Sequence, residues 1–338
     1  MFIEKTGSTA IMRVIQALLF TTLVHVGLAQ QYAASARSGE PFTTESLSFR
    51  TNAVPGTTND RAVEISATLY LPKIRKGLFP AVVIVPSSSG VEDEREVYYA
   101  RQLTQAGIAA LIVDSLGSRN IADTLYDQSL LDAWDVENDA IAALLKLAEH
   151  DLIDADRIAV MGVSKGGSAA MNTALKIQRK WMGIRDVEFA AHIAISPDCT
   201  WTTRNAATTG RPIFFMLAEF DDQTPAKFCL EQADRIRRAG NKRVATKVYD
   251  GAHHAWEELG KTPTYDEKTE NYSRCRVWVE DNGRMVSAET GEELPEKDWH
   301  SWAQKNCMTL GATCCGGTVE LKEKAALDII AFLRRWGF

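Results

Sequence analysis

The chain has no internal repeat, no low-complexity tract and no long run of basic residues, and each absence excludes a class of protein. Without a basic run, and with a formal net charge of −6 over 338 residues, we expect no nucleic-acid partner. With 22 glycines, 10 prolines and 45% hydrophobic residues, the composition excludes collagen, a coiled coil, a disordered chain and a polytopic membrane protein. A weakly acidic globular protein remains, with enough chain to build one large core.

The N-terminal segment has the pattern of an export signal. Residues 14–29 are almost wholly apolar, but this run is shorter than the roughly 20 residues that span a bilayer. Gly27 and Ala29 are small residues placed to allow cleavage before Gln30. We therefore expect residues 1–29 to be a signal peptide and residues 30–338 to be one exported domain, periplasmic or secreted. Such a domain has no stable membrane association after cleavage, and the alternative is an uncleaved N-terminal anchor.

Six cysteines are present, an even number in a chain with an apparent export signal. No Cys-x-x-Cys pair occurs and no His/Cys cluster has zinc-ligand spacing, so we expect no metal site. Disulfides are expected instead, with six buried thiols as the alternative. Because adjacent Cys314 and Cys315 are poor partners for each other, we expect them to pair with Cys275 and Cys307 in one of two orders.

The hydrophobic pattern predicts an α/β fold. Residues 45–51 and 62–71 alternate as a half-buried antiparallel pair does. Buried parallel strands are predicted at residues 79–85, 108–113, 157–161, 192–196, 213–218 and 246–249. Helices are predicted at residues 94–106, 132–149, 164–177, 227–239 and 319–336. Strands that alternate with helices indicate one mostly parallel, doubly wound sheet covered by helices on both faces.

Residues 257–318 interrupt this alternation. The segment is polar, is dotted with aromatic residues and holds four of the six cysteines. Within it, Asn282 and Gly283 separate two β-prone runs in residues 275–287, which is a strong hairpin signal. We interpret residues 257–318, called the insertion below, as a hairpin and loops held by disulfides, serving either as a lid or only as an elaborated surface.

The pattern Gly162-Val163-Ser164-Lys165-Gly166 follows a predicted buried strand and precedes a predicted helix. In this context a G-x-S-x-G pattern predicts a tight turn that lifts a serine above the sheet. The turn also places the serine at a helix N-terminus, where the helix dipole favours developing negative charge. Ser164 is therefore the candidate nucleophile, and a purely structural glycine turn is the alternative.

A serine nucleophile needs a histidine base and an acid that orients it, expected from loops at the ends of later strands. One predicted strand ends in Glu219-Phe220-Asp221-Asp222, and the next ends in Asp250-Gly251-Ala252-His253-His254. Of the six histidines, the others fall in the signal, at a helix end, at a strand start and in the insertion. The base is therefore His253 or His254.

Four motifs in residues 60–256 resemble the dienelactone hydrolase family of α/β-hydrolases. They are Val113-Asp114-Ser115-Leu116-Gly117-Ser118-Arg119, the segment from Asp154 to Ser164, the run from Glu219 to Pro225, and Gly251-Ala252-His253-His254-Ala255-Trp256. The resemblance selects Asp221 as the acid and His254 as the base. Ser164 stands where many members have cysteine, which implies an esterase-like member. Asp222 is then a loop carboxylate, and His253 a neighbour of the base.

Three further assignments follow from position. The backbone N–H groups of Ser88 (or Ser87) and Lys165 are expected to form the oxyanion hole, with the Lys165 side chain facing solvent. Trp256 is a candidate wall of the substrate pocket, although an aromatic residue there fits the core equally well. A disulfide between Cys199 and Cys229 is expected to tie the acid-bearing loop to the neighbouring strand end.

The sequence thus predicts an exported serine hydrolase that cleaves small-molecule carboxylic esters, lactones such as dienelactone included. No cofactor and no metal are implied. Two alternatives stay open: a serine peptidase of the prolyl-oligopeptidase kind, and a non-catalytic binding protein on a hydrolase scaffold. The first lacks the chain length for a propeller before the hydrolase core. An intact set of nucleophile, acid and base argues against the second.

Overall fold

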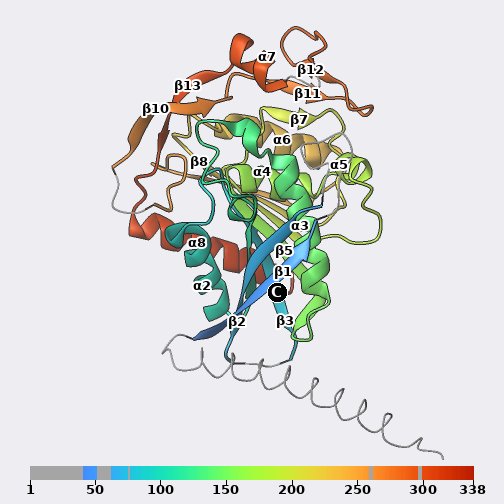
Figure 1. Ribbon diagram of the computed structural model, residues 1–338, viewed down its shortest axis with the longest axis vertical. Coiled ribbons are helices and arrows are strands. Elements are labelled where there is room, and N and C mark those ends of the chain that lie inside the picture. The colour runs from blue at the N-terminus through green and yellow to red at the C-terminus, as the bar shows by residue number, and fades with distance from the viewer. Residues whose placement is uncertain (1–40, 52–61, 75–76, 259–261, 296–298) are drawn as a thin grey trace, which may run out of the picture.

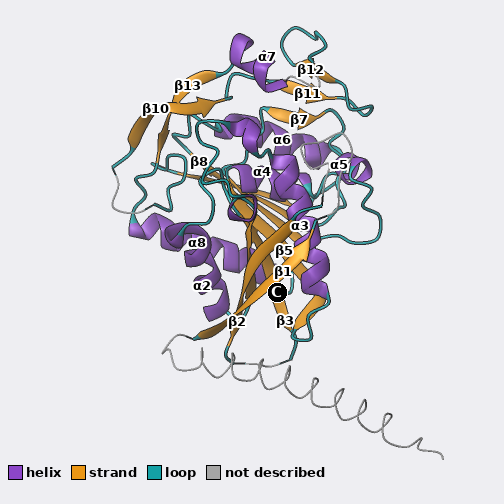
Figure 2. Cartoon of the chain, in the orientation of Figure 1, coloured by secondary structure: helices purple, strands orange, loops and turns teal. Residues whose placement is uncertain are grey.

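Eight strands form the central sheet, in the order β1-β2-β4-β3-β5-β6-β8-β9 (Figures 1 and 2). The strands from β4 to β9 in this order run parallel, and β1 and β2 form an antiparallel edge. Their bounds are β1 Phe42–Arg50, β2 Glu64–Pro72, β3 Phe79–Val85, β4 Ala109–Asp114, β5 Ile153–Val163, β6 Ala191–Ile195, β8 Ile213–Ala218 and β9 Val244–Tyr249. The predicted mostly parallel sheet is confirmed, and the expected antiparallel pair, β1 and β2, lies at its edge.

The computed structural model describes residues 41–51, 62–74, 77–258, 262–295 and 299–338. The expected signal peptide, residues 1–29, lies outside the described residues. Within these ranges, no helix combines the length and the apolar character that crossing a membrane requires.

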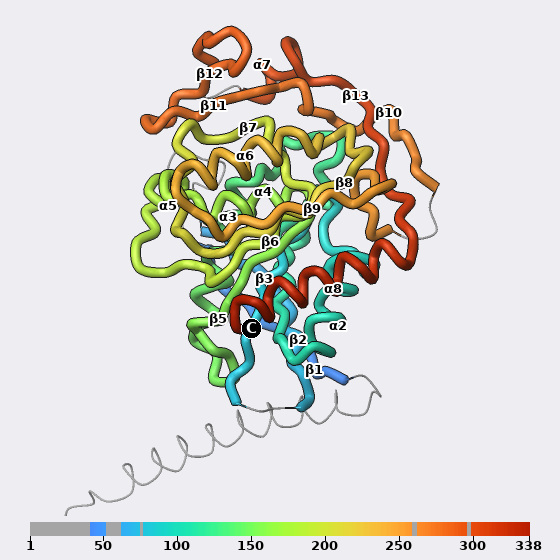
Figure 3. Tube along the Cα trace, turned by 180° about the vertical axis from the view of Figure 1, so that it is seen from behind, coloured from blue at the N-terminus to red at the C-terminus, as the bar shows by residue number. Residues whose placement is uncertain are grey.

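Helices cover both faces of the sheet. One face is covered by α3 (Ala133–Ala148), α4 (Lys165–Asn172) and α6 (Ala226–Arg238), and the other by α2 (Tyr98–Gln105) and α8 (Val319–Arg335), which lie in front of the sheet in Figure 3. All seven residues of β3 are buried because alternate side chains enter the two helix layers. A strand covered on both sides has no polar face, which explains its continuous apolar sequence.

The helix predicted at 164–177 is two helices in the structure, α4 and α5 (Lys176–Trp181). The chain leaves α4 after Asn172, and Leu175 forms an isolated β-bridge with Thr208. Leu175 has extended backbone angles (φ −75°, ψ 124°), which end the first helix and begin the second. A tertiary contact thus interrupts a sequence whose local pattern is continuously helical. Three short helical turns lie at Asp93–Val97, Gly117–Arg119 and Gln128–Leu130.

The insertion forms a layer beyond the carboxyl ends of the parallel strands, at the top of Figure 1. Its elements are β10 (Thr264–Asn271), β11 (Val277–Val279), β12 (Met285–Ser287), α7 (Trp299–Asn306) and β13 (Thr309–Cys314). β11 and β12 pair antiparallel around the Asn282-Gly283 turn, as the hairpin signal predicts. β11 also pairs with β7 (Trp201–Thr203), a strand of the loop after β6. The hairpin is thereby joined by backbone hydrogen bonds to the loop that follows the central strand β6.

Three disulfides are present among the described residues. Cys199 bonds Cys229, as expected, and links the loop after β6 to α6. The expected pairing of the other four cysteines is wrong, because Cys275 bonds Cys307 and Cys314 bonds Cys315. The chain leaves β13 at Cys315 with φ 75°, and the Cys315 N–H donates to the carbonyl of His254 (2.6 Å). This turn breaks the strand alternation that normally points adjacent side chains to opposite sides.

Candidate active site

Ser164 lies on the turn between β5 and α4 with φ 56° and ψ −119°, an unfavourable conformation for a residue with a side chain. Two glycines let the turn close. A Cβ on Gly162 would lie 2.4 Å from the backbone of Gly166, and a Cβ on Gly166 would lie 2.5 Å from the carbonyl oxygen of Val85. The Ser164 N–H donates to the carbonyl of Ile195 at the end of β6 (2.9 Å). Strand packing therefore fixes the strained residue in place.

The structure brings together the three side chains that the sequence selects. Nε2 of His254 lies 2.9 Å from Oγ of Ser164, and Nδ1 of His254 lies 2.9 Å from Oδ2 of Asp221. Asp221 follows β8, and His254 follows β9, so neighbouring strands deliver them to one edge of the sheet. The side chains of Asp221 and His254 are buried. A serine, an imidazole and a carboxylate thus form one continuous hydrogen-bonded chain.

The surroundings of Asp221 and His254 shift the pKa values of the two side chains in opposite directions. Burial raises the pKa of Asp221, but attraction to His254 and hydrogen bonds from His254 and Thr224 outweigh it and hold this pKa below its usual value. Burial lowers the pKa of His254, but the Asp221 charge and hydrogen bond raise it above the ordinary value overall. The Thr224 N–H and hydroxyl both donate to the carboxylate (2.7 and 2.8 Å). Asp221 is therefore kept as an anion that favours a protonated imidazole.

The alternative acid and base have other contacts. Asp222 accepts hydrogen bonds from the backbone N–H and the hydroxyl of Thr313 (2.9 and 2.8 Å), and so anchors β13 of the insertion. The ring of His253 packs against Phe220 with 5.5 Å between centroids. The ring that hydrogen-bonds Ser164 is that of His254, and the carboxylate that hydrogen-bonds this ring is that of Asp221, so the geometry agrees with the selection of these two residues.

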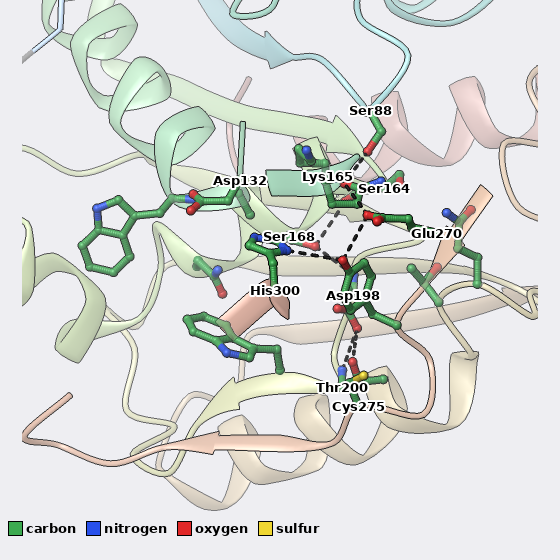
Figure 4. A pocket seen from close by; sticks show the side chains of 18 of the residues that line it. Ser88, Asp132, Ser164, Lys165, Ser168, Asp198, Thr200, Glu270, Cys275 and His300 are labelled. Carbon is green, nitrogen blue, oxygen red and sulfur yellow. Dashed lines mark hydrogen bonds between the residues drawn. The ribbon is translucent and has the colours of Figure 1, made fainter. Parts of the chain in front are cut away.

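Ser88 and Lys165, the expected oxyanion-hole residues, both line the cavity that Ser164 enters (Figure 4). The Ser88 carbonyl accepts a hydrogen bond from the Thr124 N–H (2.7 Å), and the Ser88 hydroxyl donates to Oε1 of Gln128 (3.1 Å). The loop that carries Ser88 is therefore held by the segment that precedes α3.

The expectation that the Lys165 side chain faces solvent is wrong. It is buried, and its ammonium donates to the hydroxyl of Thr124 (2.7 Å) and to the carbonyl of Leu131. Burial lowers the pKa of Lys165 to about 8, although Asp132 and Asp135 oppose this shift. The segment before α3 closes over the lysine, which the local sequence of the turn does not reveal. The side chain thus joins the serine turn to the segment that holds Ser88.

Trp256 does not line the cavity, so its assignment to the substrate pocket is wrong. It is fully buried and stacks on Tyr249 with 5.2 Å between ring centroids. It belongs to the core layer beneath α2 and α8. The chain turns at Ala255, where φ is 53°, and the next side chain enters the core.

The cavity beside Ser164 has a volume of about 220 Å³. α3 contributes Trp134 and Glu137 to its wall, and the insertion contributes the side chains of Glu270, Tyr272, Cys275, Trp299 and His300. Burial lowers the pKa of His300. Sequence reasoning missed these wall residues, because no local pattern marks them. The only sequence signal was the polar, aromatic-dotted insertion itself.

Glu270 connects the insertion to the loop that holds Ser88. Its carboxylate accepts hydrogen bonds from the Gln128 N–H (2.8 Å) and from the hydroxyl of Tyr272 (3.0 Å). Its own N–H donates to the carbonyl of Leu125 (3.0 Å). Because Gln128 in turn accepts from Ser88, a path of hydrogen bonds runs from the insertion to the expected oxyanion hole. In the described part of the chain, no cluster of three or more His, Cys, Asp or Glu side chains could hold a metal ion.

A mostly parallel sheet with a serine on a strained strand–helix turn defines an α/β-hydrolase. The family model described as "Dienelactone hydrolase family" matches residues 65–280, more than half of the chain. The chain belongs to the dienelactone hydrolase family, and is therefore a hydrolase of the ester or lactone type.

Individual relatives are distant. A curated Bradyrhizobium protein described as "Probable 2-oxo-3-(5-oxofuran-2-ylidene)propanoate lactonase" is 26% identical over 206 residues, which cover 57% of this chain and 80% of that protein. The solved structure of Thermogutta terrifontis esterase 2 phosphorylated by paraoxon is 16% identical, with a TM-score of 0.48 over 64% of this chain and 86% of that one. A thermostable esterase from Pseudomonas putida is 17% identical, with a TM-score of 0.47 over 69% of this chain and 80% of that one.

Proposed function

We propose that this protein is an exported serine hydrolase that cleaves carboxylic esters, with Ser164 as nucleophile, His254 as general base and Asp221 as the acid that orients the base. One observation supports this most directly. The hydrogen-bonded chain from the Ser164 hydroxyl through the His254 imidazole to the Asp221 carboxylate has both distances at 2.9 Å. A nucleophile within hydrogen-bond reach of a base, itself held by a third group, is the arrangement that activates a serine.

In the first half of the reaction, Oγ of Ser164 attacks the ester carbonyl carbon while His254 takes the hydroxyl proton on Nε2. The tetrahedral intermediate collapses, the carbon–oxygen bond to the alcohol breaks, and His254 returns the proton to the departing oxygen. Water then attacks the acyl-serine with His254 as base, and the acid and free serine are released. Asp221 keeps Nδ1 protonated and stabilises the imidazolium that forms in each half.

The oxyanion that forms at the carbonyl is assigned to the backbone N–H groups of Ser88 and Lys165. Lys165 is the first residue of α4, so its N–H lies at a helix N-terminus. Removal of one such donor typically costs about 3 kcal/mol of transition-state stabilisation. The buried Lys165 ammonium, bonded to Thr124, holds the two donor loops together.

The proposal is tested with a fluorophosphonate probe and p-nitrophenyl acetate. The wild type is expected to be labelled at Ser164 and to hydrolyse the ester, with kcat/KM falling as the pH drops through a pKa above the ordinary histidine value. Ser164→Ala is expected to lose labelling and at least roughly a thousandfold in kcat. Ser48→Ala, an exposed serine on β1, is the matched control and is expected to keep both. Full turnover by Ser164→Ala would contradict the proposal.

Export is supported by the apolar segment at residues 14–29 and by three disulfides, bonds that persist in oxidising compartments. N-terminal sequencing of protein recovered outside the cytoplasm is expected to begin at Gln30. Recovery of only full-length protein, associated with membranes, would favour the uncleaved anchor.

A further inference from the structure

Glu137 is a buried carboxyl group that the proposed mechanism does not use. It lies on α3, its side chain is 1% exposed, and it lines the cavity beside Ser164. Oε1 accepts hydrogen bonds from the side-chain amides of Asn172 (2.7 Å) and Gln178 (3.4 Å). Oε2 is buried and has no hydrogen-bond partner among the described residues. A buried polar atom left without a partner costs free energy, so a ligand atom is the natural partner for Oε2.

The protonation of this carboxyl follows from its surroundings. Burial raises the pKa of Glu137 to about 8, although the amides of Asn172 and Gln178 oppose the shift. The group is therefore mostly uncharged at neutral pH. Because Oε1 already accepts from two N–H donors, the proton is best placed on Oε2. A protonated Oε2 can both donate and accept a hydrogen bond, which matches a hydroxyl group.

The rest of the wall disfavours an anionic group. Lys165 is the only lysine or arginine among the described residues that line the cavity, and its ammonium is already bonded to Thr124 and Leu131. Three other carboxyl groups, of Asp132, Asp198 and Glu270, face the same space. An anion in this space would meet the repulsion of these carboxyl groups, against a single ammonium that already donates two hydrogen bonds.

Uncharged groups of modest size fit best. At about 220 Å³ the cavity is smaller than the pockets that hold drug-sized ligands, so it takes one ring-sized group. Trp134, Trp201 and Trp299 give it aromatic surface, while Gln128 and Asn172 add amide groups. Apolar walls with a few placed hydrogen-bonding groups are suited to a ring that has both apolar C–H surface and hydroxyls.

We propose that Oε2 of Glu137 binds a hydroxyl of the substrate, and that the preferred ester carries an uncharged, polyhydroxylated group, a sugar or polyol, on one side of the scissile bond. This inference rests on the proposed function of Ser164. It assigns Glu137 as a specificity-determining residue in the wall of the active site. Asn172 is a positioning residue that fixes the orientation of the Glu137 carboxyl.

Two series of esters test this assignment. The first series keeps the acetyl group and varies the alcohol: a monoacetylated methyl pentoside, cyclohexyl acetate, acetylcholine and a monoacetylated methyl glucuronoside. The second keeps methanol and varies the acid, methyl gluconate against methyl cyclohexanecarboxylate. Acid release gives kcat/KM for each ester. In at least one series, the wild type is expected to prefer the uncharged hydroxylated ester over its apolar counterpart by tenfold or more, because a site built to bind a hydroxyl rejects the analogue without it.

Three variants then test whether the preference for the hydroxylated ester depends on Glu137. Glu137→Leu is expected to bring the hydroxylated-to-apolar ratio within about threefold of unity. Glu137→Gln is expected to keep most of the preference, because an amide also offers a donor toward the cavity. Glu149→Leu, an exposed glutamate that follows the same helix, is the matched control and is expected to leave the ratio unchanged. Fluorophosphonate labelling of each variant reports whether the serine site is intact.

A second measurement uses the wild type alone, in case Glu137→Leu does not fold. Methyl pentoside is expected to inhibit p-nitrophenyl acetate hydrolysis competitively, and at lower concentration than cyclohexanol does. A preference for the apolar, cationic or anionic ester, an unchanged ratio in Glu137→Leu, or equal inhibition by the two alcohols would overturn the inference while Ser164-dependent hydrolysis stands. Absence of both hydrolysis and labelling in the wild type would instead overturn the proposed function and the inference with it.

Discussion

The sheet and the insertion build the same site by different means. The sheet places Ser164, Asp221 and His254 at the ends of β5, β8 and β9, and β8 is buried along its whole length. In the insertion, β10 is mostly exposed over its first five residues, and two disulfides lie in the segment. The family match covers the whole sheet from β3 to β9 but ends at residue 280, inside the insertion. The proposed nucleophile, acid and base therefore all lie within the matched residues, whereas two residues of the cavity wall, Trp299 and His300, lie beyond them.

The largest expected effect separates the two adjacent histidines. His254→Ala removes the proposed base, and we expect kcat to fall by roughly 10⁴-fold or more. His253→Ala removes only a ring that packs against Phe220, and we expect less than a threefold change. Steady-state kinetics with p-nitrophenyl acetate checks both variants. If the two substitutions had equal effects on kcat, the assignment of His254 as the base would be wrong.

The two long disulfides allow a direct comparison of the sheet region with the insertion. Cys199–Cys229 and Cys275–Cys307 span 30 and 32 residues, so loop-closure entropy predicts nearly equal stabilisation, about 3–4 kcal/mol each. We expect the Cys199→Ser, Cys229→Ser double variant to lower the main thermal transition. The Cys275→Ser, Cys307→Ser variant is expected to produce an earlier, separate transition, because the hairpin packs on a small apolar cluster of its own and pairs with the rest of the fold through three-residue β7.

Calorimetry distinguishes the outcomes. A single transition, lowered equally in both double variants, would mean that the insertion unfolds together with the sheet and that the contrast between the two regions is not one of stability. Reduced ester turnover with an unchanged main transition in the second variant would support an insertion that shapes the site without stabilising the sheet.

The sequence predicted the sheet well because buried parallel strands leave a plain signal. β3 is a continuous apolar run, and the turn at Ser164 needs glycines at positions that the G-x-S-x-G pattern contains. The same logic failed for the helix at 164–177, since the bridge between Leu175 and Thr208 joins residues far apart in sequence. Local patterns describe elements that local forces determine, and a long-range contact can divide such an element.

The site was predicted where it depends on strand order and missed where it depends on loops. Asp221 and His254 follow strands whose ends must meet at one edge, so their meeting follows from the topology. The wall residues Glu137 and Glu270 come from a helix face and from the insertion, and no spacing rule joins them. The Cys314–Cys315 bond was not predicted because adjacent cysteines are poor partners, and the positive φ at Cys315, where the chain turns out of β13, is not visible in the sequence.

The smallest effect we predict is that of a substitution at Glu270, which tests whether the insertion influences the chemical step. Glu270→Leu removes the acceptor for the Gln128 N–H, and Gln128 in turn accepts from Ser88. Hydrogen bonds to a charged group are worth about 1.5–3 kcal/mol, so we expect roughly a tenfold loss in kcat from a less ordered oxyanion loop. Glu270→Gln is expected to recover part of this loss, because its amide oxygen still accepts.

Glu267→Leu alters an exposed glutamate on the same strand and is the matched control, expected to change kcat less than twofold. The readout is the division between kcat and KM for p-nitrophenyl acetate, a substrate too small to need the whole cavity. A rise in KM with kcat unchanged would show that Glu270 acts only in binding. In that case the sheet and the insertion would have separate roles. The sheet with its own loops would supply every group that acts in the reaction, and the insertion would contribute only residues of the cavity wall.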